Sequence, residues 1–320
     1  MGSRLVLSGT RTRSSGRSGH LVSVRVRVRF RFRRSRHGIL RIERPRQLPR
    51  PPTIGWPGQH RHPFASDPSV TPRETATDLR RRLEAVAEPA TKVWFENYLK
   101  HAVSYRGVKT PQVSRILADW RRVHDLGQWP DKDQLALARS LIEGRFAEDK
   151  FAGTLYIQKY LLRRMDPVQI LDAAENLFAS GAFFDWSTTD WLSVRVLGPM
   201  IARYDMPVAR RVAEWRGAEN LWQRRSSIVP FRTVVRDEAY HPVIEATVEA
   251  LVPERDRFIQ TGIGWVISDL SKVHPKVAEA LVERHFADFS PEVIRRHTRH
   301  LPGHAEYKRR ASVNLRKGNP

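Results

Sequence analysis

The sequence predicts an all-α fold, and three observations support this class. Apolar residues follow helical spacing through residues 71–320, a capping residue followed by proline recurs along the chain, and convincing period-2 alternation is missing from this region. Helix pairs recur at a spacing of about 40 residues, which is typical of HEAT-like repeats stacked into a helical-repeat solenoid, an α-α superhelix. A compact irregular bundle is the alternative architecture.

The predicted helices can be placed in order from their caps and apolar residues. The first helix begins at Thr71-Pro72, where Glu74 completes a capping box. Apolar residues such as Leu79 and Leu83 then lie on one side of it. About a dozen helices of roughly 10–18 residues fit the pattern up to residue 305. Later starts of the same kind are Thr110-Pro111, Asp166-Pro167 and Ser290-Pro291.

The predicted helical domain covers residues 71–305, and other regions flank it. Later stretches such as ILDAAENLF, VIEATVEALV and VAEALVERHF continue the helical pattern of the domain. Residues 306–320 are basic and are predicted to form a disordered tail. Residues 1–70 are predicted to form a disordered Arg- and Pro-rich leader and linker.

The positive charge is concentrated in the leader. The chain has 56 Lys and Arg against 34 Asp and Glu, a formal net charge of +22. Residues 1–70 hold 16 arginines but only two acidic residues, Glu43 and Asp67, so they contribute +14 of that charge. Residues 71–320 are therefore moderately basic. A positive field attracts polyanions, which makes nucleic acid the first candidate partner.

The leader has several parts and no settled role. Residues 1–20 have a disordered composition, and residues 21–34 alternate like a single strand that lacks a partner. Eight prolines from Pro45 to Pro72 indicate an extended linker. Three interpretations stay open: a basic nucleic-acid-binding arm, an organelle-targeting peptide, or an over-extended gene start with the true start near Val70.

Several function classes lose their usual signatures. Cysteine is absent, which excludes disulfides, zinc-thiolate sites and cysteine nucleophiles. The twelve histidines show no HExxH or comparable metal spacing, so we expect no metal and no cofactor. The GxxxxGK[ST], GxGxxG and GxSxG motifs are missing as well. No apolar run approaches the roughly 18 residues of a membrane-spanning helix.

Four segments carry more polar and aromatic residues than packing requires. In the segment 183–198, Trp186 and Asp190 are four residues apart and share a helix side. The alternative is that Trp186 packs in the core and Asp190 caps or pairs near the helix start. In the segment 220–231, Arg224 and Arg225 follow a tryptophan. The alternative to a functional role for these arginines is a solvated basic turn. The four segments are 95–112, 183–198, 220–231 and 257–275.

The segments 257–275 and 95–112 contain aromatic residues near glycines. Trp265 follows Gly262 and Gly264, two glycines that permit close approach of another chain or a ligand to the helix. The alternative is a buried tryptophan that packs against a neighbour through this gap. In the first segment, Tyr98 precedes a glycine turn and the Thr110-Pro111 helix start.

The segments contain four motifs in a fixed order: NYLKHAVSYRGVKTP, WSTTD, WQRRSSIV and FIQTGIGWVISDLSKVHP. In this order they resemble the DNA alkylation-repair glycosylases built from HEAT-like repeats, the AlkD-like family. That family's motifs are a Tyr followed by [FL]xGx[KR]TP, then WDTVD, W-x-x-R-[RAST]-x-x-I and FIQKxIGWxLRxxSKxxP. The resemblance covers about residues 75–302.

The resemblance implies the residues of the site. Its catalytic acid falls on Asp190 and its partner arginine on Arg225, and the residues of the cleft should line one concave face. Three positions depart from the family pattern, because Ser187 replaces an Asp, Thr261 a frequent Lys and Ser268 a frequent Arg. The predicted contacts to the lesion and to DNA are Trp186, Trp265, Tyr98, Arg224 and Lys272, and the predicted phosphate contacts are those of Arg224, Arg225 and Lys272.

The resemblance also implies a function. We expect a monofunctional, metal-independent DNA glycosylase that hydrolyses the N-glycosidic bond of alkylated purines such as 7-methylguanine and 3-methyladenine in duplex DNA. The expected protein is monomeric, contacts no membrane and lies in the cytoplasm with a bacterial nucleoid, unless the leader targets an organelle. The alternatives are a non-catalytic HEAT-repeat scaffold that binds DNA or protein, and an RNA-binding repeat, for which no per-repeat base-reading pattern is present.

Overall fold

The computed structural model describes residues 71–316, so the predicted leader, its strand-like stretch and its linker lie outside the described residues. Within residues 71–316 the chain forms helices and no β-strand; only an isolated bridge joins Ser104 to Phe146. The prediction of an all-α protein is confirmed. None of the helices in this part of the chain is both long and apolar enough to cross a membrane.

The α-helices follow one another with short connections, several of which contain 3-10 or π-helical turns. Three of them, α7, α9 and α13, are shorter than the predicted lengths. The bounds are α1 Pro72–Glu84, α2 Pro89–Tyr98, α3 Thr110–Val123, α4 Asp131–Ile142, α5 Ala147–Tyr156, α6 Pro167–Ala179, α7 Trp186–Leu192, α8 Gly198–Glu214, α9 Leu221–Ser226, α10 His241–Leu251, α11 Arg257–Leu270, α12 Pro275–Arg284, α13 Pro291–His297 and α14 His304–Arg316.

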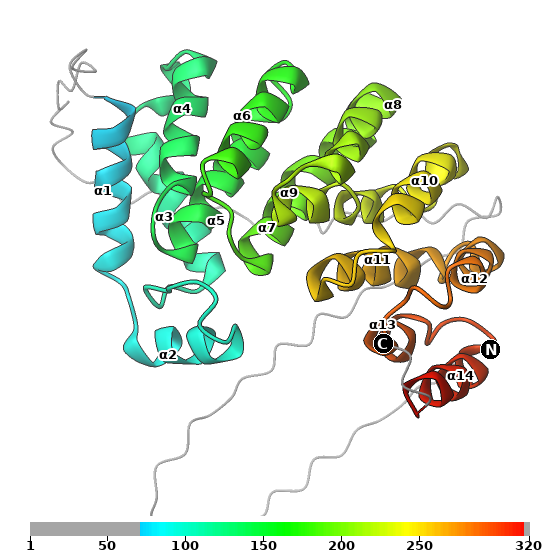
Figure 1. Cartoon of the computed structure of the whole chain (residues 1–320). Helices are drawn as coiled ribbons and strands as arrows, with labels where there is room; N and C mark the ends of the chain where they lie inside the picture. The colour runs from blue at the N-terminus through cyan, green and yellow to red at the C-terminus, as the bar shows by residue number, and fades with distance from the viewer. Residues whose placement is uncertain (1–70, 317–320) are drawn as a thin grey trace, which may run out of the picture. The chain divides into compact units, whose positions relative to one another are not determined.

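The helices pack in two layers (Figure 1). One layer, the outer layer, runs through α1, α4, α6, α8 and α10, and each of these helices contacts the next. The second, the inner layer, runs in the same way through α3, α5, α7, α9, α11 and α13. Figure 1 shows the helices fanning out around an arc with the outer layer on its wider side. Successive inner helices therefore present their side chains to one common surface, as in a helical-repeat solenoid.

Helix starts follow their local sequence at most of the predicted positions. Thr71 forms a capping box with Glu74, and Asp166 accepts a hydrogen bond from the N–H of Val168. Ser290 caps α13 through the N–H of Val293. The prediction of a Thr110 cap is wrong, because α3 already includes Thr110 and its capping position is Lys109, without a side-chain cap.

The segment that carries α7 continues into α8 through a π-helical turn, η3 (Ser193–Leu197). The helical path breaks at Asp205, whose φ of 61° and ψ of −151° are not helical. Pro207 follows two residues later, where a fixed φ suits a new helix start. A second, smaller apolar cluster lies beneath α2 and the start of α5, separate from the main core; its buried members are Leu99, Val103, Tyr105, Ala147 and Phe151.

The C-terminal region differs from its prediction. Residues 306–316 belong to α14 and do not form the predicted disordered tail. Tyr307 and Ala311 are four residues apart, and both are buried against the main core. The Tyr307 ring lies 6.0 Å from that of Phe286, and this contact gives a mostly basic helix one apolar side.

Candidate functional site

The N-terminus of α7 is fixed by Asp185, a residue that is not among the predicted site residues. One carboxylate oxygen of Asp185 accepts hydrogen bonds from the N–H groups of Ser187 and Thr188 at 2.8 and 3.0 Å. The other accepts from the Thr188 hydroxyl. Asp185 is therefore the cap of α7, and Asp190 is free of that role. Asp190 lies more than one turn further along the same helix.

Asp190 forms a two-point ion pair with Arg225 of α9. The Nε of Arg225 donates to Oδ1 of Asp190 at 2.8 Å, and its Nη2 donates to Oδ2 at 2.9 Å. Both residues are buried, Asp190 with 7% and Arg225 with 3% of its surface exposed. Burial is the largest influence on the pKa of the Asp190 carboxyl and raises it, while the Arg225 and Arg232 guanidiniums act in the opposite direction. Because both oxygens accept N–H donors, this pair holds a carboxylate in one orientation.

The third nitrogen of Arg225 is anchored on α11. Its Nη1 donates to the carbonyl of Phe258 and, at 3.3 Å, to Oγ1 of Thr261. A Cβ on Gly262 would lie 3.1 Å from the same nitrogen, so the missing side chain at this position gives the guanidinium its room. Thr261, a departure from the family pattern, thus helps to hold Arg225. All three nitrogens serve contacts within the protein, and two of them hold the Asp190 carboxylate.

Trp265 lies next to the pair with two guanidiniums near its ring. The Cζ of Arg225 is 5.6 Å and that of Arg232 is 4.4 Å from the ring centroid. Asp269 accepts from Nε of Arg232 at 2.7 Å and thereby fixes the second guanidinium. Arg232 lies outside the predicted segments, and no sequence signal placed it here. Arg232 provides a positive charge beside Trp265. Position 268 cannot provide one, because a serine stands there instead of the arginine that is frequent in the family pattern.

Trp186 lies at the start of α7 and packs against a different apolar cluster from Trp265, which packs against the main core. Its ring is half-buried and packs against the second apolar cluster, together with Trp191. Tyr105 of the same cluster is buried, and this burial raises the pKa of its hydroxyl. The structure thus brings Asp190, Arg225 and Trp265 into one contact group and places Trp186 one turn away on the helix that carries Asp190.

Three other predicted residues lie apart from this group. Tyr98 is 63% exposed at the end of α2, where it stacks on Trp94 with ring centroids 5.3 Å apart. Arg224 donates to the Glu254 carboxylate at 2.9 Å and, through Nη1, to the carbonyls of Ala218 and Glu219. Its guanidinium is used in the packing of α9, contrary to the predicted phosphate contact.

Lys272 follows α11 and pairs with Asp269 at 2.5 Å, on the second oxygen of the carboxylate that holds Arg232. The two cations lower the pKa of Asp269, although burial acts against them. Lys272 therefore belongs to the support of Trp265 through Asp269 and Arg232, and its side chain stays half in solvent with 45% exposed.

The YRGVKTP motif builds the turn before α3. The buried carboxylate of Glu148 accepts three hydrogen bonds, from the backbone N–H groups of Arg106, Gly107 and Val108. Gly107 has a φ of 106°, and a Cβ there would lie 2.3 Å from the carbonyl oxygen of Glu88. Arg106 in turn pairs with the buried Asp149 at 2.9 Å. The motif is therefore explained by a backbone turn that fixes α3, and not by direct chemistry.

Within residues 71–316 no group of three or more His, Asp or Glu side chains is arranged to hold a metal ion. The fold and the site define an all-α protein of stacked helices whose inner layer holds a buried Asp–Arg pair next to a tryptophan. The sequence model of one protein family, described as DNA alkylation repair enzyme, matches residues 79–301. This chain belongs to that family.

A solved structure supports the fold. A predicted DNA alkylation repair enzyme from Enterococcus faecalis is similar to this chain with a TM-score of 0.58 and 18% sequence identity. The match covers 68% of this chain and 97% of that chain. No curated protein matches the chain. The family match therefore carries the assignment to alkylation repair, and the structural match supports the helical architecture.

Proposed function

We propose that this protein is a DNA glycosylase that releases cationic alkylated purines, such as 7-methylguanine and 3-methyladenine, from duplex DNA. The observation that carries the proposal is the Asp190–Arg225 pair, because it places an oriented carboxylate beside an aromatic ring on the inner layer. Membership of the alkylation-repair family supplies the class of damage. The pair also favours an enzyme over a non-catalytic scaffold, because a scaffold has no need of a buried charge in this position.

The chemistry of the substrate matches such a site. Alkylation at N3 or N7 makes the purine cationic, so its glycosidic bond is weakened and the base leaves as a neutral molecule. Bond cleavage passes through an oxocarbenium-like sugar, and water adds to C1′ to complete the hydrolysis. One negative charge can stabilise this positive sugar, and no acid has to protonate the leaving base. Asp190 is the residue that we assign to this role.

The neighbours of Asp190 have supporting roles. Arg225 fixes both carboxylate oxygens, so the charge does not have to reorganise as the sugar becomes positive. Trp265 and Trp186 offer aromatic faces, which attract a cationic base by about 0.5–2 kcal/mol per contact. Such an enzyme needs no nucleophilic lysine and therefore leaves an intact abasic strand.

Wild-type activity provides the first test. The full chain is incubated with methylated duplex DNA, released bases are separated by chromatography, and the DNA strand is sized before and after alkali. We expect free 7-methylguanine or 3-methyladenine and a strand that breaks only after alkali. Strand breaks without alkali would contradict the monofunctional mechanism. Binding of the duplex without release of any base would favour the non-catalytic scaffold.

A further inference from the structure

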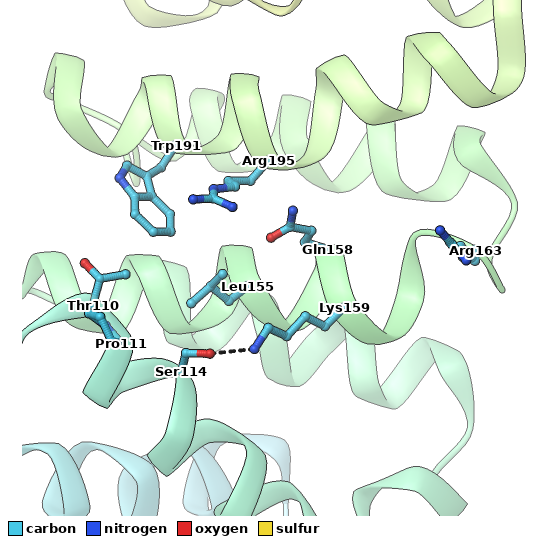
Figure 2. A pocket seen from close by; sticks show the side chains of 9 residues that line it. All are labelled: Thr110, Pro111, Ser114, Leu155, Gln158, Lys159, Arg163, Trp191 and Arg195. Atoms are coloured by element: carbon cyan, nitrogen blue, oxygen red, sulfur yellow. Dashed lines mark hydrogen bonds between the residues drawn. The ribbon is translucent and has the colours of Figure 1, made fainter. Parts of the chain in front are cut away.

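A cavity of about 580 Å³ lies between three consecutive inner helices and is distinct from the Asp190–Arg225 pair. Its walls come from α3, from α5 with the π-helical turn η2 (Ile157–Leu161), and from α7 with η3 (Figure 2). No acidic residue lines it. The lining residues that matter here are Ser114, Gln158, Lys159, Arg163, Trp191 and Arg195.

Within residues 71–316, the cations of this cavity lack the carboxylate partner that several arginines of the inner and outer layers have. Lys159, Arg163 and Arg195 are exposed, and in the described part of the chain none of them forms an ion pair. By contrast, Arg211 and Arg224 each pair with a glutamate. Positive charges gathered without a counter-charge repel one another, so an anion that enters between them is stabilised.

Two of the cations are held in place by neutral groups. Nζ of Lys159 donates to Oγ of Ser114 at 2.5 Å, which Figure 2 marks by a dashed line. The guanidinium of Arg195 lies over the Trp191 ring, 5.0 Å from its centroid. These contacts orient the cations without neutralising them, and both keep N–H donors for a ligand. Gln158 lies between them and adds an amide (Figure 2).

The cavity has a defined position relative to Asp190. Trp191 of α7 and Arg195 of η3 both line the cavity, whereas the neighbouring Asp190 binds Arg225 of α9. Neighbouring packed helices lie about 8–10 Å apart.

We propose that Lys159 and Arg195, with Arg163 at the rim, form a subsite for a phosphodiester group of the DNA backbone. The subsite holds a DNA strand on the inner layer, next to the helix that carries Asp190. It replaces the predicted phosphate contacts of Arg224 and Arg225, whose guanidiniums are used within the protein. The proposal rests on the proposed function for its DNA partner, but it concerns binding and not base release.

The test measures binding of undamaged duplex DNA by the full chain, which does not depend on base release. The pocket variant is Lys159→Gln with Arg195→Gln. The control is Arg203→Gln with Arg210→Gln on α8 of the outer layer, which removes the same charge; Arg203 also lies over an aromatic ring, that of Tyr204. Dissociation constants are measured between 50 and 300 mM salt, and thermal melting checks that both proteins are folded.

We expect the pocket variant to bind duplex DNA at least tenfold more weakly and to lower the salt slope by about one per lost phosphate contact. The outer-layer control should keep the wild-type slope, and the charge-conserving variant Lys159→Arg with Arg195→Lys should recover most of the affinity. Equal losses in the pocket variant and the control would overturn the proposal, because only net charge would then matter.

A second arm distinguishes a backbone phosphate from free phosphate. Inorganic phosphate, matched in ionic strength by chloride, is added to the wild-type complex. Weak competition, no greater than that of chloride, is expected for a subsite that belongs to a longer DNA interface. Strong competition by phosphate with unchanged duplex binding in the pocket variant would overturn the DNA assignment. If the pocket result holds but the wild type releases no base, the subsite stands and the glycosylase proposal fails.

Discussion

Adjacent arginines on α9 hold two different carboxylates, and their surroundings differ. Arg224 pairs with Glu254, which is 29% exposed, while Arg225 pairs with Asp190 in the interior. Successive residues of a helix point about 100° apart, so one arginine turns to the packing of α9 and the other to the inner layer. Both arginines were predicted to belong to the site, because a sequence motif does not show which neighbour a long side chain reaches.

Arg225→Lys tests whether the orientation of Asp190 matters. A lysine keeps the charge but has one nitrogen, so it cannot bond both carboxylate oxygens and also reach the carbonyl of Phe258. We expect single-turnover base release to slow by about 10²-fold, the loss that a displacement of about 1 Å can cause. The comparison is Arg224→Lys, which should lower the melting temperature slightly and leave base release near wild type. Equal losses of base release in both variants would contradict the structural assignment of Arg224.

At the scale of elements, α11 connects the site to α13 through two glycines. Gly262 leaves room for Arg225, and Gly264 leaves room for His297, whose ring would lie 2.5 Å from a Cβ at that position. Burial among neighbouring arginines lowers the pKa of His297 to about 4, so this ring packs in its neutral form. The sequence predicted a close approach at these glycines but not that the protein's own side chains fill both gaps.

Gly264→Ala measures how tight this packing is. The added methyl group clashes with the His297 ring, and we expect a loss of about 1–3 kcal/mol in the free energy of unfolding. Gly217 is the control, because a Cβ there would have no atom within 4 Å and its φ is not positive. Gly217→Ala should be neutral or stabilise by up to about 1 kcal/mol. Chemical denaturation of both variants checks the result, and equal stabilities would contradict the contact.

Local signals predicted local structure well and long-range structure less well. The caps at Thr71, Asp166 and Ser290 were predictable because each cap bonds a backbone group within three residues. The missing cap of α3 was not predictable, since the turn before this helix is held by Glu148, about 40 residues away in the sequence. The contact of Arg232 with Trp265 could not be predicted either, because only the packing of the helices brings the two residues together.

At the scale of the whole molecule, the repeat of helices explains how distant motifs meet. The residues of the contact group come from α7, α9 and α11, three successive helices of the inner layer. Their spacing of 35 residues between Asp190 and Arg225 is close to the predicted repeat, so the sequence could place them on one surface. It could not predict the phosphate subsite, because scattered lysines and arginines carry no spacing signal of their own.

Removal of residues 1–70 tests the independence of the helical part. The contacts described for the proposed site join residues within 71–316, so single-turnover base release at saturating DNA should stay within about threefold of the full chain. Residues 1–70 contribute +14 of the net charge of +22, so their removal should lower the affinity for undamaged duplex DNA and weaken its salt dependence. Loss of base release from a truncated protein that melts normally would show that the leader takes part in the site.

The most direct test of the central claim is the rate of base release by Asp190→Asn beside a matched variant. Asparagine keeps the shape of the side chain but removes the charge that faces the oxocarbenium-like sugar. Glu254→Gln removes the charge from the carboxylate paired with Arg224, the neighbouring arginine. Single-turnover release of 7-methylguanine is measured for both proteins, with thermal melting and duplex binding as controls for folding and affinity.

We expect Asp190→Asn to slow release by about 10²–10³-fold, because one preorganised electrostatic contact is lost. Its affinity for duplex DNA should be equal to or higher than wild type, because a carboxylate near phosphates repels them. Glu254→Gln should release the base at nearly the wild-type rate. Normal release by a folded Asp190→Asn protein, or an equal loss in both variants, would contradict the claim that the Asp190 carboxylate performs the chemistry.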